Sequence, residues 1–172
     1  MIGFALYGHK KISILDGGFM KWVEDGFQTS VEEIDIEKAG DFVAKIDQDL
    51  LFDFEMMKKN LEKKSHQMVD ARGAKSFIGE EDIEGDIKHG HIPGARNIPF
   101  SDLFNEDGTF KSDHALKQLF DAANIDLGRP VVASCLTGMT ACGLAAAMHV
   151  LGKEKVPVYY VWFLDGVAST CR

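Results

Sequence analysis

The stretch from residue 131 to residue 151 constrains the fold of this 172-residue chain more than any other. A short apolar run at 131–133 leads through Ser134 to Cys135, a loop of small and hydroxyl residues follows, and residues 141–151 have the composition of a helix. A buried strand that enters a helix through a short loop is typical of α/β proteins with parallel sheets. We therefore expect a mostly parallel sheet flanked by helices.

The remainder of the chain alternates short apolar runs with helical segments in the same way. The predicted helices are 19–24, 53–64 with Asp53 as N-cap, 74–78, 113–124 and 141–151. The predicted strands are 12–15, 67–70, a short one within 90–99, 131–134 and 156–159. Arg72 and Cys135 both follow predicted strands. Because ligands bind beyond the carboxyl ends of parallel strands, these two side chains are expected to converge at one edge.

Charge and composition exclude several classes of partner. The formal net charge is −8, and no basic stripe interrupts it, so nucleic acid and anionic membrane surfaces are not expected partners. No apolar run approaches the roughly 20 residues that span a bilayer. The three cysteines lack CxxC spacing, which favours a reducing compartment and predicts neither a disulfide scaffold nor a metal site.

Cys135 is the candidate nucleophile of the chain. It lies between a strand end and a helix start, where unpaired backbone N–H groups and the helix dipole both favour a negative charge. Such surroundings favour the thiolate, which is the reactive form of cysteine. The structural alternative is a buried free cysteine at a strand end, which is common in proteins.

Four sequence motifs together point to a known family. They are residues 15–19 with Trp22, residues 69–72, residues 90–99 and residues 135–141. In this order and spacing, the chain resembles the tandem-domain rhodanese family of thiosulfate and 3-mercaptopyruvate sulfurtransferases. The resemblance implies a rhodanese-like three-layer fold with a short, mostly parallel central sheet flanked by helices. It also implies three parts: the remnant of a first rhodanese-like domain at 1–27, a linker at 28–50, and a catalytic domain at 51–172 with an atypical or truncated end.

The resemblance also assigns roles to individual residues. It implies that Cys135 attacks a sulfur donor and carries the sulfur as a persulfide, and that Arg72 holds the carboxylate or sulfonate of the donor. An arginine offers a planar, bidentate fork for such an anion, although an ion pair with Asp70 or with the acidic loop at 80–88 is the structural alternative. The implied active-site loop, in which Gly138 permits a tight turn and Thr140 caps the helix, consists of Leu136, Thr137, Gly138, Met139 and Thr140.

Substrates follow from the same comparison. Leu136 and Thr137 carry no charge, which favours 3-mercaptopyruvate over the dianion thiosulfate. The implied acceptor is a thiol or cyanide, with thioredoxin as a candidate, and no cofactor is implied. Related enzymes occur in mitochondria and in the cytoplasm, and residue 1 onwards has the features of neither a signal peptide nor a transit peptide.

Several departures from the family pattern keep other functions open. Ser76 stands where a second substrate arginine is expected, with Lys75 beside it, and no counterpart is found for a His and an Asp that the first domain of the mercaptopyruvate enzymes supplies. The alternative is therefore a non-catalytic rhodanese-like module that binds a partner. A phosphatase is disfavoured because its loop is one residue longer and ends in arginine. Residues 8–17 also resemble 152–159, as a repeated domain end would.

Overall fold

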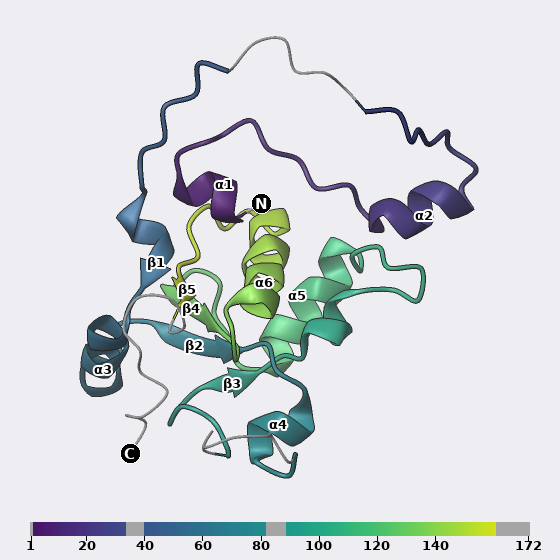
Figure 1. Ribbon diagram of the computed structural model, residues 1–172. Helices are drawn as coiled ribbons and strands as arrows, with labels where there is room; N and C mark the ends of the chain where they lie inside the picture. The colour runs from purple at the N-terminus through teal and green to yellow at the C-terminus, as the bar shows by residue number, and fades with distance from the viewer. Residues whose placement is uncertain (1, 34–39, 82–88, 161–172) are drawn as a thin grey trace.

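The computed structural model describes residues 2–33, 40–81 and 89–160, and it contains a five-stranded sheet in which every pair of neighbours is parallel (Figure 1). The strand order is β1-β5-β4-β2-β3. The strands are β1 (Leu51–Phe52), β2 (Gln67–Asp70), β3 (Arg96–Asn97), β4 (Val131–Ser134) and β5 (Val158–Tyr159). The prediction of an α/β fold with a short parallel sheet is therefore confirmed.

Helices cover both faces of the sheet. Helices α5 (Asp113–Ala122) and α6 (Met139–Val150) lie on one face, and α3 (Phe54–Lys63) and α4 (Ala74–Ile78) lie on the other (Figure 1). Successive side chains of a strand point to opposite faces. Accordingly, Val131 and Ala133 of β4 belong to the larger core cluster with Leu144 and Phe120, whereas Val132 belongs to a second cluster with Phe52, Met57 and Met68.

Local signals in the sequence set the helix ends. The Asp53 side chain accepts a hydrogen bond from the Met56 N–H at 2.7 Å, as the N-cap prediction requires. Ser112 caps α5 in the same way. Helix α6 is the exception, since it begins at Met139, two residues before the predicted start.

The predicted strand at 12–15 is wrong. These residues have no regular secondary structure and pair with no described strand, and the side chains of Ile14 and Leu15 are about half exposed. An apolar run becomes a strand only when another strand supplies hydrogen-bond partners. The segment instead connects α1 (Ile2–Leu6) to α2 (Gly18–Glu24). Residues 27–33 and 40–47 have no regular structure, and a 3-10 helix, η1 (Gln48–Leu50), follows them.

Two further expectations concern residues outside the described ranges. They are residues 82–88 of the acidic loop, which was one alternative partner for Arg72, and the atypical end of the chain beyond Tyr160. Within the described ranges, no helix combines the length and the apolar character needed to cross a membrane. A second 3-10 helix, η2 (Phe100–Leu103), packs against α6 beside the site described next.

Candidate active site

The pairing of β2 with β4 brings the two predicted site residues to one edge of the sheet. Asp70 is in register with Ser134, so the chain leaves both strands at the same level. The Ala71 N–H then donates to the Ser134 carbonyl at 2.8 Å. Arg72 and Cys135 therefore follow neighbouring carboxyl ends, as the order of the strands in the sequence predicted.

The Cys135 loop turns sharply at Gly138. Gly138 is buried, has φ 86° and ψ −17°, and is the N-cap of α6. Its N–H donates to Cys135 Sγ at 2.9 Å. The positive φ is a conformation that glycine adopts without a steric penalty, which agrees with the tight turn predicted here. The loop therefore directs a backbone donor from the start of a helix at the sulfur atom.

The other loop residues surround the thiol without capping the helix. Thr140 lies inside the first turn of α6, and no side chain caps that helix, so the predicted cap is wrong. Gly138 occupies the cap position because the helix starts two residues early. Leu136, Thr137 and Met139 are exposed, and two of these side chains, Leu136 and Met139, are apolar.

A second thiol lies close to the first. Cys142 Sγ donates to the Gly138 carbonyl at 3.2 Å, and the side chain is half-buried against the larger core cluster. Burial raises the pKa of the Cys142 thiol above its ordinary value, and the neighbouring charge of Cys135 raises this pKa further. Cys142 is thus held in the neutral form.

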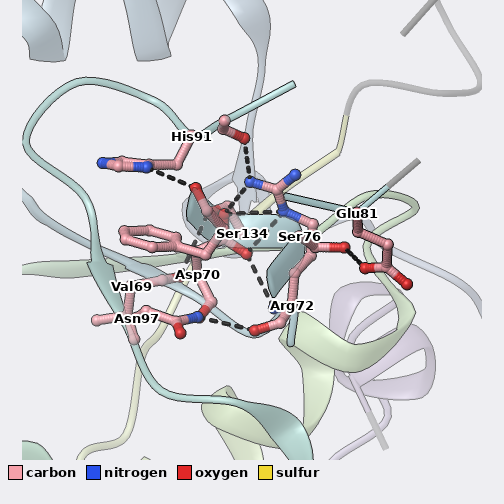
Figure 2. A network of polar contacts seen from close by, with 10 residues as sticks. Val69, Asp70, Arg72, Ser76, Glu81, His91, Asn97 and Ser134 are labelled. Atoms are coloured by element: carbon pink, nitrogen blue, oxygen red, sulfur yellow. Dashed lines mark hydrogen bonds and ion pairs between the residues drawn. The ribbon is translucent and has the colours of Figure 1, made fainter. Parts of the chain in front are cut away.

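Arg72 forms the ion pair that was the structural alternative for this residue. Its Nε donates to both carboxylate oxygens of Asp70, at 3.1 and 3.0 Å, and its Nη2 donates to Asp70 Oδ2 at 2.7 Å and to the Gly90 carbonyl at 2.8 Å (Figure 2). The side chain of Asp70 is 4% exposed and that of Arg72 is 14% exposed. Within the described part of the chain, the side-chain hydrogen bonds of Arg72 are made by Nε and Nη2, and Nη1 makes none.

Asn97 holds the corner in which Arg72 lies, and sequence reasoning missed this role. Its Nδ2 donates to the backbone carbonyls of Asp70 and Arg72, at 3.0 and 2.8 Å (Figure 2). Nearby, His91 Nδ1 donates to the Phe77 carbonyl at 2.7 Å and the two rings stack. The motif at 90–99 therefore acts as a scaffold for the end of β2.

Ser76, at the position of the missing second arginine, pairs with an acidic side chain. The Ser76 hydroxyl donates to the Glu81 carboxylate (Figure 2). Lys75, beside it in α4, is exposed. The neighbourhood of Arg72 consequently contains a carboxylate that would disfavour a doubly charged anion.

Other candidate sites on the described residues do not compete with Cys135. No group of three or more His, Cys, Asp or Glu side chains suited to a metal ion occurs among the residues that the structure describes. A hollow of about 360 Å³ lies beside the carboxyl end of α6, at His149 and Phe110. A second hollow, of about 340 Å³, lies at the amino ends of the strands, at Leu51 and His66.

One aromatic contact of the loop was also missed. A β-carbon built on Gly138 would lie 2.9 Å from Cδ2 of Tyr160, so the tyrosine ring packs directly on the glycine. Tyr160 follows β5 immediately. No local pattern marks it, because the contact joins residues 22 positions apart through the sheet.

Known proteins share this architecture. The Rhodanese-like domain family matches residues 53–166. A thiosulfate sulfurtransferase of Gallus gallus is 41% identical over 156 residues, covering 91% of this chain and 53% of that protein. A 3-mercaptopyruvate sulfurtransferase of Homo sapiens is 38% identical over 157 residues, covering 91% and 52%.

A solved structure gives the same result in three dimensions. The crystal structure of SseA from Escherichia coli, a 3-mercaptopyruvate sulfotransferase, matches with a TM-score of 0.81 and 27% identity, over 95% of this chain and 61% of that one. The chain spans about half the length of the curated relatives it matches. With its matched fold and sequence, the chain belongs to the rhodanese-like family.

Proposed function

We propose that the chain is a sulfurtransferase that moves sulfane sulfur from a small anionic donor to a thiophilic acceptor through a persulfide on Cys135. The observation that carries this proposal is the 2.9 Å hydrogen bond from the Gly138 N–H to Cys135 Sγ at the start of α6. A backbone donor at a helix N-terminus stabilises an anionic sulfur. Relatives named as sulfurtransferases support the same activity.

The proposed donor is 3-mercaptopyruvate, with thiosulfate as the second choice. The Cys135 thiolate attacks the donor sulfur and a sulfur–sulfur bond forms while the carbon–sulfur bond breaks. The carbon takes the electron pair and then a proton, which yields pyruvate. The uncharged Leu136 and Thr137, together with the Ser76–Glu81 pair, favour a donor with a single negative charge.

Arg72 is the proposed donor-binding residue. Its Nη1 supplies the N–H groups that would meet the donor carboxylate, while Asp70 and Gly90 hold the rest of the guanidinium. The loop residues Leu136 to Thr140 line the approach. In the second step, the thiolate of a thiol acceptor, or cyanide, attacks the outer sulfur of the persulfide and regenerates the Cys135 thiolate. Thioredoxin is a candidate acceptor.

The domain assignment belongs to the same proposal. Residues 51–172 form the catalytic domain, residues 28–50 the linker, and residues 1–27 correspond to the end of a first rhodanese-like domain. The family match at 53–166 supports the start of the catalytic domain. The proposed location is the mitochondrion or the cytoplasm.

Persulfide labelling tests the proposed function. Protein incubated with 3-mercaptopyruvate, and separately with thiosulfate, is treated with a persulfide-specific reagent and the labelled peptide is identified by mass spectrometry. We expect label on the Cys135 peptide, no label in Cys135→Ser, and normal label in the matched control Cys142→Ser. A folded protein that takes up no label from either donor would instead favour the second candidate, a non-catalytic binding module, to which the Arg72–Asp70 and Ser76–Glu81 pairs point.

A further inference from the structure

The ring of Tyr160 covers Gly138, a residue that is hydrogen-bonded to both thiols. Gly138 donates its N–H to Cys135 Sγ and accepts from Cys142 Sγ through its carbonyl. On its other side, Gly138 faces Cδ2 and Cε2 of Tyr160, which would lie 2.9 and 3.3 Å from a β-carbon at this position. Gly138 is therefore enclosed between the sulfur atoms and an aromatic ring.

The sheet fixes the position of Tyr160. The Tyr160 N–H donates to the Phe52 carbonyl at 3.1 Å, which continues the pairing of β5 with β1 by one residue. Val158, two residues earlier and on the same face of β5, also approaches Gly138. The ring is consequently attached to the sheet through the backbone, although the Tyr160 residue itself is 39% exposed.

The loop between Cys135 and α6 has little other packing. Leu136, Thr137 and Met139 are exposed, whereas Gly138 is buried. A glycine with positive φ is the most permissive backbone position, so a neighbouring surface is needed to restrict it to one conformation. The atoms nearest to a β-carbon built on Gly138 belong to the Tyr160 ring and the Val158 side chain.

We propose that Tyr160 is a positioning residue for sulfur chemistry at Cys135: its ring holds Gly138 so that the Gly138 N–H points at Sγ. The ring, rather than the hydroxyl, performs this role, because the contact is made by Cδ2 and Cε2. The effect of the ring on the Cys135 thiolate does not depend on the proposed function. Its extension to the persulfide rests on that function, since the N–H would stabilise the persulfide anion in the same way.

The pH dependence of Cys135 alkylation tests this proposal. Iodoacetamide is added over a pH series in a Cys171→Ser background, and the Cys135 and Cys142 peptides are quantified separately. In Tyr160→Ala we expect the rise of the Cys135 rate to move to higher pH and the rate at pH 7 to fall several-fold. Tyr160→Phe, which keeps the ring, should match the parent protein, as should the control Tyr7→Ala at another exposed tyrosine.

The outcomes separate this inference from the proposed function. An unchanged Cys135 profile in folded Tyr160→Ala, or an equal shift in Tyr160→Phe, would overturn it. If Tyr160→Ala fails to fold by circular dichroism, Tyr160→Leu is measured in the same way, and an unchanged profile would again overturn the role of the ring. A shifted profile in a protein that takes up no persulfide would support the positioning role and reject sulfur transfer.

Discussion

The Cys135 loop and the Arg72 corner end neighbouring strands, yet they are built in opposite ways. Around Cys135, a backbone N–H of Gly138 makes the polar contact, and the surrounding side chains are exposed. Around Arg72, side chains make the contacts, and the guanidinium is bonded to a buried carboxylate. The difference indicates that the loop presents the Cys135 thiol with few contacts that stabilise the fold, whereas the Arg72 corner is built around a buried ion pair.

The largest expected effect is a difference in the free energy of unfolding between a variant of the Arg72 corner and a variant of the Cys135 loop. Arg72→Ala leaves the Asp70 carboxylate buried without its partner, which should lower the free energy of unfolding by about 3–5 kcal/mol. Cys135→Ser should change it by less than about 0.5 kcal/mol, because it removes no structural contact of this kind. Urea unfolding followed by circular dichroism measures both.

The double variant Arg72→Ala/Asp70→Asn serves as the control for that experiment. Replacing the carboxylate with an amide removes the unpaired charge, so part of the lost stability should return. Equal losses for Arg72→Ala and Cys135→Ser would contradict the contrast between the two regions.

A smaller effect sharpens the description of the loop. Gly138→Ala places a β-carbon at positive φ, which costs of order 1–2 kcal/mol, and adds a clash with the Tyr160 ring. The matched control is Gly26→Ala, which has φ 78° and no heavy atom near its would-be β-carbon. Thermal unfolding should show a greater loss for Gly138→Ala, and the excess should shrink in a Tyr160→Ala background. An equal loss of stability for the two variants would indicate that the Tyr160 ring does not pack against Gly138 closely enough to oppose a β-carbon.

The two thiols within the loop region provide a further test. Burial raises the pKa of Cys142, and the thiolate is the form that reacts, so the midpoint of its alkylation profile should lie above the ordinary value of 9.0. At pH 7.5 we expect Cys135 to react about 10-fold faster or more, corresponding to about 1.4 kcal/mol. Peptide mapping after brief iodoacetamide treatment measures the ratio. Comparable rates would remove the distinction between a reactive and a packed cysteine.

The smallest expected effect concerns His66, which lies at the amino ends of the strands, opposite the Cys135 loop and the Arg72 corner. Burial, together with the charge of Lys153, lowers the pKa of His66 below 6.5 in the folded state. The unfolded chain therefore binds the proton more tightly, and stability should fall as the pH drops through and below 6.5. His66→Gln should weaken this dependence in thermal unfolding at pH 5–8, without altering the alkylation profile of Cys135. A change in that profile would mean that the protonation of His66 is coupled to the reactivity of Cys135.

Much of the architecture follows from patterns that lie within a few residues of each other. The apolar runs predicted β2, β4 and β5, and Asp53 predicted the start of α3. The run at 12–15 looked the same by these criteria but forms no strand. Such patterns describe which face of a segment is apolar, and they contain no information on whether a partner strand is within reach.

The sequence by itself determined the parallel α/β fold, the turn at Gly138 and the choice of Cys135 as candidate nucleophile. Each depends on interactions between near neighbours: side-chain period, φ preference and the ends of helices. Only the tertiary structure decided that Arg72 pairs with Asp70, that Asn97 clamps the end of β2 and that Tyr160 covers Gly138. The contacts of Asn97 and Tyr160 join segments that strand order and register bring together. The Arg72–Asp70 pair depends on which group satisfies the buried carboxylate at the end of β2, and no spacing along the chain specifies that group.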